Sequence, residues 1–189
     1  HQDIRLQRHY RRRNSRRRAA QLRRHHARAS GLRCAYGGVE SDLRGIESHG
    51  IVRLKDHYID RISNGDTNPK PKIQILHEAS STALMDGDAG IGLVVGYRAM
   101  ELAIQKAGVT GAGFVSVTNS RHFGIAGYYP TMAISHDMIG IAMTNASPLV
   151  VPTFGSVPML GTNPISIAAP VDDGPPFILD MATSVVSAG

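Results

Sequence analysis

The sequence predicts an α+β protein in which a helical N-terminal segment precedes a mixed, largely antiparallel sheet domain. Two observations support this class. Apolar residues recur at helical spacing over two long stretches, residues 39–64 and 93–108, whereas short apolar runs bounded by Gly, Asn and Pro dominate the second half. Most of these runs lie too close together for helical crossovers, so the strands are expected to pair mainly as hairpins.

The first predicted element is one long helix over residues 39–64. The stretch "SNGDTNPKPK" ends it, and Gly50 is the point where it would break, because Gly costs a helix interior about 1 kcal/mol relative to Ala. Strands follow in "KIQILHEA" and "STALMDGD", and the polar residues between them predict a hairpin. The helix over residues 93–108 comes next, with Gly108 as its C-terminal cap.

The remaining elements alternate with loops. A buried strand is predicted in "GAGFVSVTNS", a short helix interrupted near Pro130 in "IAGYYPTMAISHD", and further strands in "MIGIAMTNAS", "PISIAAP" and "PFILDMA". The segment "GTNPIS", Gly161 to Ser166, contains the turn-forming pair Asn-Pro and is expected to position the strand after it.

Charge divides the chain into an arm and a body. Residues 1–34 hold 12 of the 21 Lys and Arg residues but one of the 15 acids, so the arm carries +11 and the body −5. We expect the arm to be disordered, because it buries too little apolar surface to offset its ordering entropy. Its composition is also typical of transit peptides and of nucleic-acid binding, and GC-rich DNA read out of frame would give the same residues. No aromatic platform for bases accompanies the arginines, so nucleic acid is not the expected partner.

Cysteine content and apolar runs indicate the compartment. Cys34 is the single cysteine and cannot form an internal disulfide. No apolar run approaches the roughly 18 residues needed to cross a bilayer. We therefore expect a cytoplasmic protein with no membrane contact, and no metal ion at its functional site.

The stretch "GDAGIGLVVG" follows a predicted strand and opens a helix, as the Gly-rich turn of a dinucleotide fold does. Gly90, Gly92 and Gly96 have GxGxxxG spacing instead of GxGxxG, and the next strand ends without an acid for the ribose hydroxyls. We therefore expect a non-Rossmann fold, with these residues serving as glycines at a helix start.

Two segments concentrate groups that can bind an anion and move a proton. "RGIESHGIVR" holds Arg44, Ser48, His49 and Arg53, and "NSRHFGIAGYY" places His122 just past a buried strand. A guanidinium can hold a carboxylate through two charge-assisted hydrogen bonds, and an imidazole can exchange a proton near neutral pH. A solvated polar helix face would also explain the arginines, and a single His near a strand end is more often structural.

Five motifs carry a resemblance to a known family. "DLRGIESHGIVRL", "SRHFGIAGYY", "TNASPLVVPTFG", "LGTNPISIAAP" and "LDMATS" resemble, in this order and spacing, the malate/L-lactate dehydrogenase family of NAD(P)-dependent 2-oxoacid oxidoreductases. That family also contains sulfolactate, ureidoglycolate and 2,3-diketogulonate enzymes and reductases of cyclic imino acids. The resemblance runs from about Ser41 to Ala188 and implies a fold distinct from the Rossmann dehydrogenases.

The resemblance implies roles for the first two motifs. It places Ser48, His49 and Arg53 at the substrate end, and it places His122 where a proton donor or acceptor acts in ureidoglycolate-type members. His122 is the favoured proton donor, with His49 and Ser48 orienting the substrate oxygen. Arg53 is expected to grip the substrate carboxylate, and Arg44 is a second predicted substrate-binding group.

The last motifs are implied to face the cofactor, NAD or NADP. Asp180 resembles the carboxylate that partners His49 in imino-acid-reducing members, although an acid that merely closes a strand is the alternative. Together with Met181 and Ala182, Asp180 also matches a place where cofactor contacts are made. The region of Ala146 matches another such contact.

These roles predict hydride transfer between nicotinamide C4 and C2 of a small 2-oxo or 2-hydroxy acid. Because family members are much longer, the chain is expected to be a weakly active N-terminal fragment that forms a homodimer when full length. It would comprise the arm, a helical substrate-side segment over residues 35–72 and an incomplete α+β nicotinamide-binding domain over residues 73–189. The alternatives are an inactive remnant, or a binding module whose basic arm recruits nucleic acid.

Overall fold

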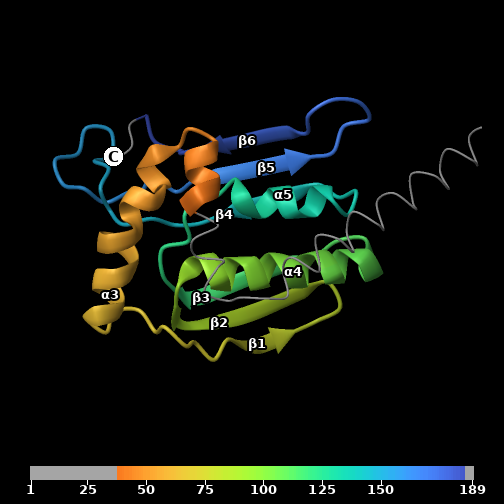
Figure 1. Cartoon of the computed structure of the whole chain (residues 1–189), viewed down its shortest axis with the longest axis horizontal. Coiled ribbons are helices and arrows are strands. Elements are labelled where there is room, and N and C mark those ends of the chain that lie inside the picture. Colours follow the sequence, from red (N-terminus) through yellow and green to blue (C-terminus); the bar gives the residue numbers. More distant parts are fainter. Residues whose placement is uncertain (1–37, 186–189) are drawn as a thin grey trace, which may run out of the picture.

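The computed structural model describes residues 38–185, so the predicted disorder of the arm concerns residues outside this range. Two three-stranded sheets, with strand orders β1-β2-β3 and β4-β5-β6, lie on either side of two helices (Figure 1). Helix α4, Gly92–Thr110, packs on the first sheet and against α5, Tyr128–Ile134, which packs on the second sheet. The predicted α+β class is confirmed, and the layers follow the order sheet, α4, α5, sheet.

The first sheet contains one predicted and one unpredicted connection. Strands β1, Gln74–Glu78, and β2, Thr82–Gly90, pair antiparallel as the predicted hairpin. Strand β3, Phe114–Ser120, pairs in parallel with β2, and α4 joins the two as a β-α-β unit. This unit is the exception to the expected hairpins. Its core lies between β2 and α4, where Met85 and Val95 belong to one buried cluster.

The second sheet is antiparallel throughout. It consists of β4, Gly140–Met143, β5, Ile165–Ala169, and β6, Phe177–Met181. Helix α5 covers its inner face, and the predicted interruption of this helix at Pro130 is wrong. Pro130 is the third residue of α5, within the first turn, where backbone N–H groups have no intrahelical partner, so its missing N–H breaks no bond.

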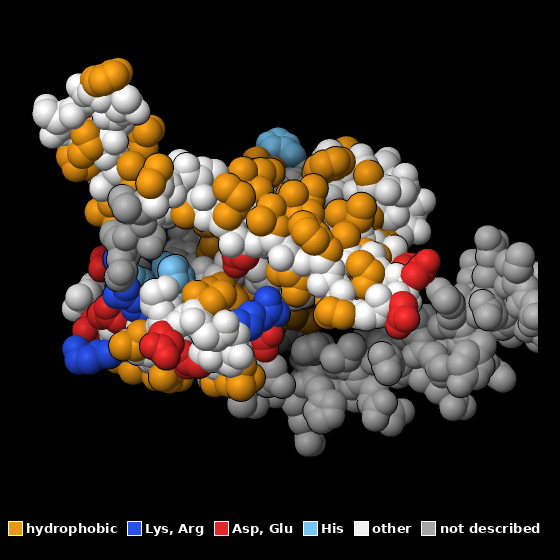
Figure 2. All heavy atoms as spheres, turned by 90° about the horizontal axis from the view of Figure 1, so that it is seen from above, with side chains coloured by type: hydrophobic (Ala, Val, Ile, Leu, Met, Phe, Trp, Pro, Cys, Tyr) orange, Lys and Arg blue, Asp and Glu red, His pale blue; other side chains and the backbone are white. Residues whose placement is uncertain are grey.

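The outer face of the second sheet is apolar at every paired position. The register aligns Ile141 with Ile167 and Leu179, and the neighbouring row aligns Met143 with Ile165 and Met181. The exposed fractions of Ile141, Met143 and Met181 are 53%, 66% and 45%. Figure 2 shows this side of the molecule, where hydrophobic side chains cover much of the surface. A continuous apolar surface of this kind is typical of contact sites.

The segment over residues 39–64 breaks at Gly50 as anticipated, but the prediction of one long helix is wrong, because the segment folds as a series of short helical pieces. They are an α-helix over residues 38–43, the 3-10 turns η1, Glu47–His49, and η2, Ile51–Arg53, the π-helical stretch η3, Leu54–Ile59, and the closing α-turn α3, Asp60–Ser63.

A tertiary contact at Gly50 explains the break. A Cβ atom at Gly50 would lie 1.6 Å from Oδ1 of Asp42, so only glycine leaves room for this carboxylate. The other carboxylate oxygen of Asp42 accepts a hydrogen bond from the backbone N–H of Ile51 at 3.0 Å. Asp42 therefore holds the chain extended at Gly50 and starts the next turn.

Helix α4 continues past its predicted cap. Gly108 lies inside the helix, and Gly111, with φ +86°, ends it in the left-handed conformation that glycine adopts without strain. The prediction of Gly108 as the cap is therefore wrong by three residues. Among residues 38–185, no helix combines the length and the apolar character needed to span a bilayer.

The glycines around the start of α4 each face protein atoms. A Cβ at Gly90 would lie 2.7 Å from the ring of Pro71, and one at Gly96 would lie 2.8 Å from the ring of Tyr129. A Cβ at Gly92 would lie 2.1 Å from the carbonyl oxygen of Arg121. These contacts favour the interpretation of the motif as a helix start that packs closely on its neighbours.

Candidate active site

His122 lies in the loop that follows β3, and this loop is fixed from two sides. At the start of α4, Gly92 packs directly on the backbone, because a Cβ there would lie 2.1 Å from the carbonyl oxygen of Arg121 and 2.6 Å from that of His122. In α5, the hydroxyl of Tyr129 donates a hydrogen bond to the carbonyl of Phe123. The two central helices therefore determine the position of His122.

Three imidazole rings meet where this loop contacts the N-terminal helical pieces. The ring centroid of His122 lies 5.7 Å from that of His49, in a stacked arrangement with an interplanar angle of 19°. It lies 4.8 Å from that of His57, which approaches edge-on at 78°. Sequence reasoning did not include His57, although it follows Arg53 by four residues, as Arg53 follows His49.

Tyr58 is a second site residue that sequence reasoning missed. Its side chain is buried, and its hydroxyl oxygen lies 2.9 Å from Nδ1 of His122. The backbone N–H of Gly124 points at the same nitrogen from 3.4 Å. A Tyr on a helical apolar stripe carries no signal in the sequence that distinguishes a ligand of an imidazole from a core residue.

The histidines lie in surroundings that favour the uncharged ring. Burial, together with the smaller electrostatic effects of His57, His49, Arg53 and Arg61, lowers the pKa of His122 to about 4. Burial also lowers the pKa of His49, as does Arg53, while the carboxylate of Asp180 acts in the opposite direction. Both rings are therefore neutral at pH 7 in the unliganded site.

Arg53 and Ser48 are brought together with His49. The Ser48 hydroxyl lies 3.0 Å from Nδ1 of His49, and Nε of Arg53 donates to the Ser48 carbonyl at 2.8 Å. The Arg53 Nη1 atom lies 3.5 Å from a carboxylate oxygen of Asp56. The predicted substrate-end residues thus form one hydrogen-bonded group beside the stacked imidazoles.

Arg44 has a different partner. Its Nε and Nη2 atoms both donate to Oε1 of Glu40, at 2.9 and 2.7 Å. Ser48 follows Arg44 by four residues, a spacing that would make them neighbours on a helix, but the helix that would align them ends at residue 43. The structure therefore pairs Arg44 with an acid of the preceding helical piece.

Asp180 lies on β6 and faces the start of α5. Its Oδ2 atom accepts a hydrogen bond from the backbone N–H of Gly127 at 2.6 Å, and a Cβ at Gly127 would lie equally close, at 2.6 Å, to that oxygen. The charge of Asp180 also acts on His49. The strand that carries Asp180 is thus electrostatically coupled to the histidine cluster.

The other predicted cofactor residues lie at the same end of the second sheet. Ala146 follows β4, Met181 ends β6, and Ala182 comes directly after it. The turn at Gly161–Ser166, predicted to position β5, also contacts Ala146, because Oδ1 of Asn163 accepts its backbone N–H at 2.9 Å. Asn163 has φ +37°, a conformation that Asn tolerates better than most residues.

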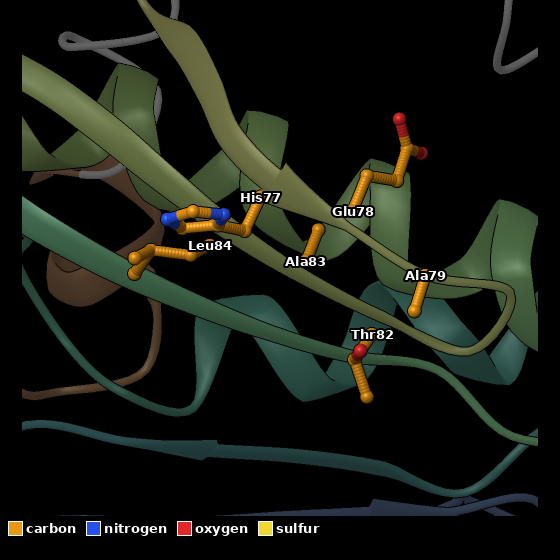
Figure 3. Close-up of a pocket in the computed structure, with 6 residues that line it drawn as sticks. All are labelled: His77, Glu78, Ala79, Thr82, Ala83 and Leu84. Carbon is orange, nitrogen blue, oxygen red and sulfur yellow. The ribbon is translucent and has the colours of Figure 1, made fainter.

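A separate pocket of about 300 Å³ lies at the far end of the β1–β2 hairpin, and it contains none of the predicted site residues (Figure 3). Its lining comprises His77, Glu78, Ala79, Thr82, Ala83 and Leu84. Glu78 there accepts from Nζ of Lys106 at 2.7 Å. Within the described part of the chain, no group of three or more His, Cys, Asp or Glu side chains is arranged to hold a metal ion.

Comparison with known proteins extends the resemblance carried by the five motifs. A malate dehydrogenase of Pyrococcus abyssi is 60% identical over 151 residues, which is 80% of this chain and 41% of that protein. An L-sulfolactate dehydrogenase of Methanocaldococcus jannaschii is 50% identical over 151 residues, which is 80% of this chain and 43% of that protein. The chain therefore spans less than half the length of these relatives.

A solved structure agrees with the sequence comparison. The malate dehydrogenase of Pyrococcus horikoshii OT3 matches with a TM-score of 0.79 at 58% identity, over 82% of this chain and 44% of that chain. The family model for malate/L-lactate dehydrogenase matches residues 18–189. The chain belongs to the malate/L-lactate dehydrogenase family.

Proposed function

We propose that this chain provides the substrate and proton-transfer side of an NAD(P)-dependent 2-hydroxyacid dehydrogenase. Such an enzyme moves a hydride between nicotinamide C4 and C2 of a small 2-hydroxy or 2-oxo acid, and the cofactor supplies that chemistry. The observation that carries the proposal is the group formed by His122, His49 and Arg53, which combines proton-exchanging rings with a guanidinium.

His122 is the proposed proton donor and acceptor. As hydride reaches C2 of an oxo acid, the C2 oxygen becomes negative and needs a hydrogen-bond donor that delivers a proton. The His122 ring contacts those of both His49 and His57, and two helices hold its loop, so its ring is preorganised. His49 and Ser48 would orient the substrate oxygen, and Asp180 would act on the His49 ring.

Arg53 is the proposed carboxylate ligand. Its Nε is engaged by the Ser48 carbonyl, which fixes the guanidinium, and a substrate carboxylate would meet its terminal nitrogens after displacing Asp56 from Nη1. Arg44 is a second proposed substrate-binding group, which would first have to exchange Glu40 for the substrate.

The nicotinamide is proposed to lie near Ala146, Asp180, Met181 and Ala182. A fold other than the Rossmann type is part of this proposal, because the glycines at 90, 92 and 96 face protein atoms instead of an open surface. Residues 35–72 would form the substrate side and residues 73–189 the nicotinamide side. A cytoplasmic homodimer is the proposed state of the whole protein.

Nucleotide binding followed by turnover tests the proposal. NADH and NADPH are titrated into the 189-residue chain while nicotinamide fluorescence is recorded, and malate, lactate and sulfolactate are then offered with the oxidised nucleotide. We expect saturable binding of at least one nucleotide and weak turnover by this chain, and in a full-length relative we expect His122→Ala to lower kcat by about 10² to 10⁴. Binding of neither nucleotide would contradict the proposal.

Two further outcomes would support a different function or a different proton donor. Nucleotide binding without turnover of any substrate would favour an inactive remnant. Near-normal kcat in His122→Ala, together with loss of activity in His49→Ala, would give the proton-donor role to His49 and Asp180, as in reduction of cyclic imino acids.

A further inference from the structure

We propose that Tyr58 is a positioning residue for His122. Its hydroxyl holds Nδ1 of the imidazole and leaves the Nε2–H group to meet the substrate. This inference rests on the proposed function of His122, and it adds a residue that the motifs of the family resemblance do not assign.

The geometry of the contact supports this role. The Tyr58 hydroxyl oxygen lies 2.9 Å from Nδ1 of His122, a normal hydrogen-bond length, and the Tyr58 side chain is 8% exposed. His57 and Tyr58 are consecutive residues of η3, yet both of their rings contact His122, with centroid distances of 4.8 and 5.7 Å. In this π-helical stretch, two adjacent side chains thus contact the same imidazole ring.

A backbone group determines which ring nitrogen carries the proton. The N–H of Gly124 points at Nδ1 from 3.4 Å, and a backbone N–H can only donate. This N–H favours Nδ1 as the acceptor in the neutral ring, and the Tyr58 hydroxyl, at the shorter distance of 2.9 Å, is then the main donor to its lone pair. The single proton of the neutral imidazole then lies on Nε2.

The charges around the ring also favour this neutral form. Four groups from four elements act on it: His57 of η3, His49 of η1, Arg53 of η2 and Arg61 of α3. All of them oppose a positive charge on His122. A neutral imidazole that presents an N–H can polarise a carbonyl, as an Nε2–H directed at the C2 oxygen would do. For the ring to pass this proton to the oxygen, Nδ1 would have to take up the Tyr58 hydroxyl proton in the same step, so that the ring stays neutral and the phenolate regains its proton from solvent.

A hydrogen bond from Tyr58 to Nδ1 would affect the protonation of His122, whereas packing of the Tyr58 ring alone would not. If Tyr58 only filled space, Phe at this position would leave the protonation behaviour of His122 unchanged. If Tyr58 donates to Nδ1, its removal takes away a bond that stabilises the neutral ring. The ring should then accept a second proton more readily.

Nitrogen NMR of the ¹⁵N-histidine-labelled 189-residue chain tests this. In the wild type at pH 7, we expect His122 to show an unprotonated, hydrogen-bonded Nδ1 and a protonated Nε2. In Tyr58→Phe, the Nδ1 resonance should move, and the titration midpoint of His122 should rise by roughly one pH unit. Tyr97→Phe, which removes a hydroxyl from a buried residue of α4, is the matched control and should change neither.

The wild-type spectrum decides the question even where a variant folds poorly. A protonated Nδ1 in the wild type at pH 7 would overturn the inference, as would a Tyr58→Phe spectrum and titration equal to those of the wild type. Because no nucleotide or substrate is present, failure of the proposed function would appear only in the nucleotide titration.

Discussion

Oδ1 of Asn163 accepts a hydrogen bond from the backbone N–H of Ala146 over 2.9 Å. The same turn also binds the chain that follows β6, because the N–H of Thr183 donates to the carbonyl of Thr162 at 2.9 Å. One turn therefore fixes both segments that are proposed to contact the cofactor. None of the residues in these two hydrogen bonds belongs to the histidine cluster.

Replacing Asn163 should separate cofactor binding from proton transfer. In Asn163→Ala the N–H of Ala146 loses its acceptor, at a cost of about 1–3 kcal/mol in unfolding free energy, and NAD(P)H affinity should fall. Asn163→Asp keeps an oxygen at this position and should retain most of the affinity. Nicotinamide fluorescence titration and denaturant unfolding give the two readouts, and equal affinity in both variants would contradict the assignment.

Arg53→Ala should weaken binding of the substrate more than it slows the chemistry. Loss of a bidentate carboxylate contact predicts a rise in KM, or in the Kd for a 2-oxo acid, of about 10- to 100-fold, with a smaller change in kcat. Arg53→Lys keeps the positive charge but lacks the planar guanidinium that makes two parallel hydrogen bonds. Its KM should therefore lie between those of the wild type and Arg53→Ala. Arg98→Ala removes an equal charge from α4, where Arg98 pairs with Glu101, and serves as the control.

The histidine cluster should make the fold sensitive to acid. The pKa of folded His122 is about 4 against an ordinary value of 6.5, so the unfolded chain binds more protons between these limits. The free energy of unfolding should therefore fall as the pH drops from 6.5 to 4, by at most about 3 kcal/mol from this residue. Urea unfolding across this range should show a shallower dependence in His122→Gln, and an equal slope in both proteins would contradict the argument.

Two glycines of α4 should respond in opposite directions to alanine. At Gly92 the added methyl group would meet the carbonyl oxygens of Arg121 and His122, so Gly92→Ala should destabilise the fold by about 1–3 kcal/mol or more. At Gly108 the nearest atom is Cε of Met138 at 3.9 Å, and the higher helix propensity of alanine should stabilise the fold by up to about 1 kcal/mol. Thermal unfolding of both variants measures the difference, and a stable Gly92→Ala would show that α4 can move off the His122 loop.

Local signals in the sequence predicted most of the strands and the class of the fold. The β1–β2 hairpin and the strands of the second sheet follow from short apolar runs between turn residues. The break at Gly50 was anticipated from the sequence, but the division of residues 39–64 into short helical pieces was not, because it depends on contacts such as that of the Asp42 carboxylate beside Gly50. Periodicity reports an apolar stripe and not the path of the backbone beneath it.

Only part of the candidate site was predicted, because the sequence shows local motifs but not contacts between distant segments. His49, Arg53 and His122 belong to recognisable motifs, and the structure brings them together. His57 and Tyr58 became visible only when the loop after β3 was placed against η3, since their role depends on a partner more than 60 residues away. Assignments of substrate and cofactor contacts to single residues stay predictions.

The apolar outer face of the second sheet also has a practical consequence. Attraction between such faces is non-directional, and it strengthens in solutions of sulfate and phosphate. Self-association of the purified chain should therefore increase with protein concentration and depend on the type of salt, at temperatures where the chain is still folded. Ammonium sulfate fractionation should precipitate the chain early, and light scattering in dilute buffer of low ionic strength should give the smallest particles.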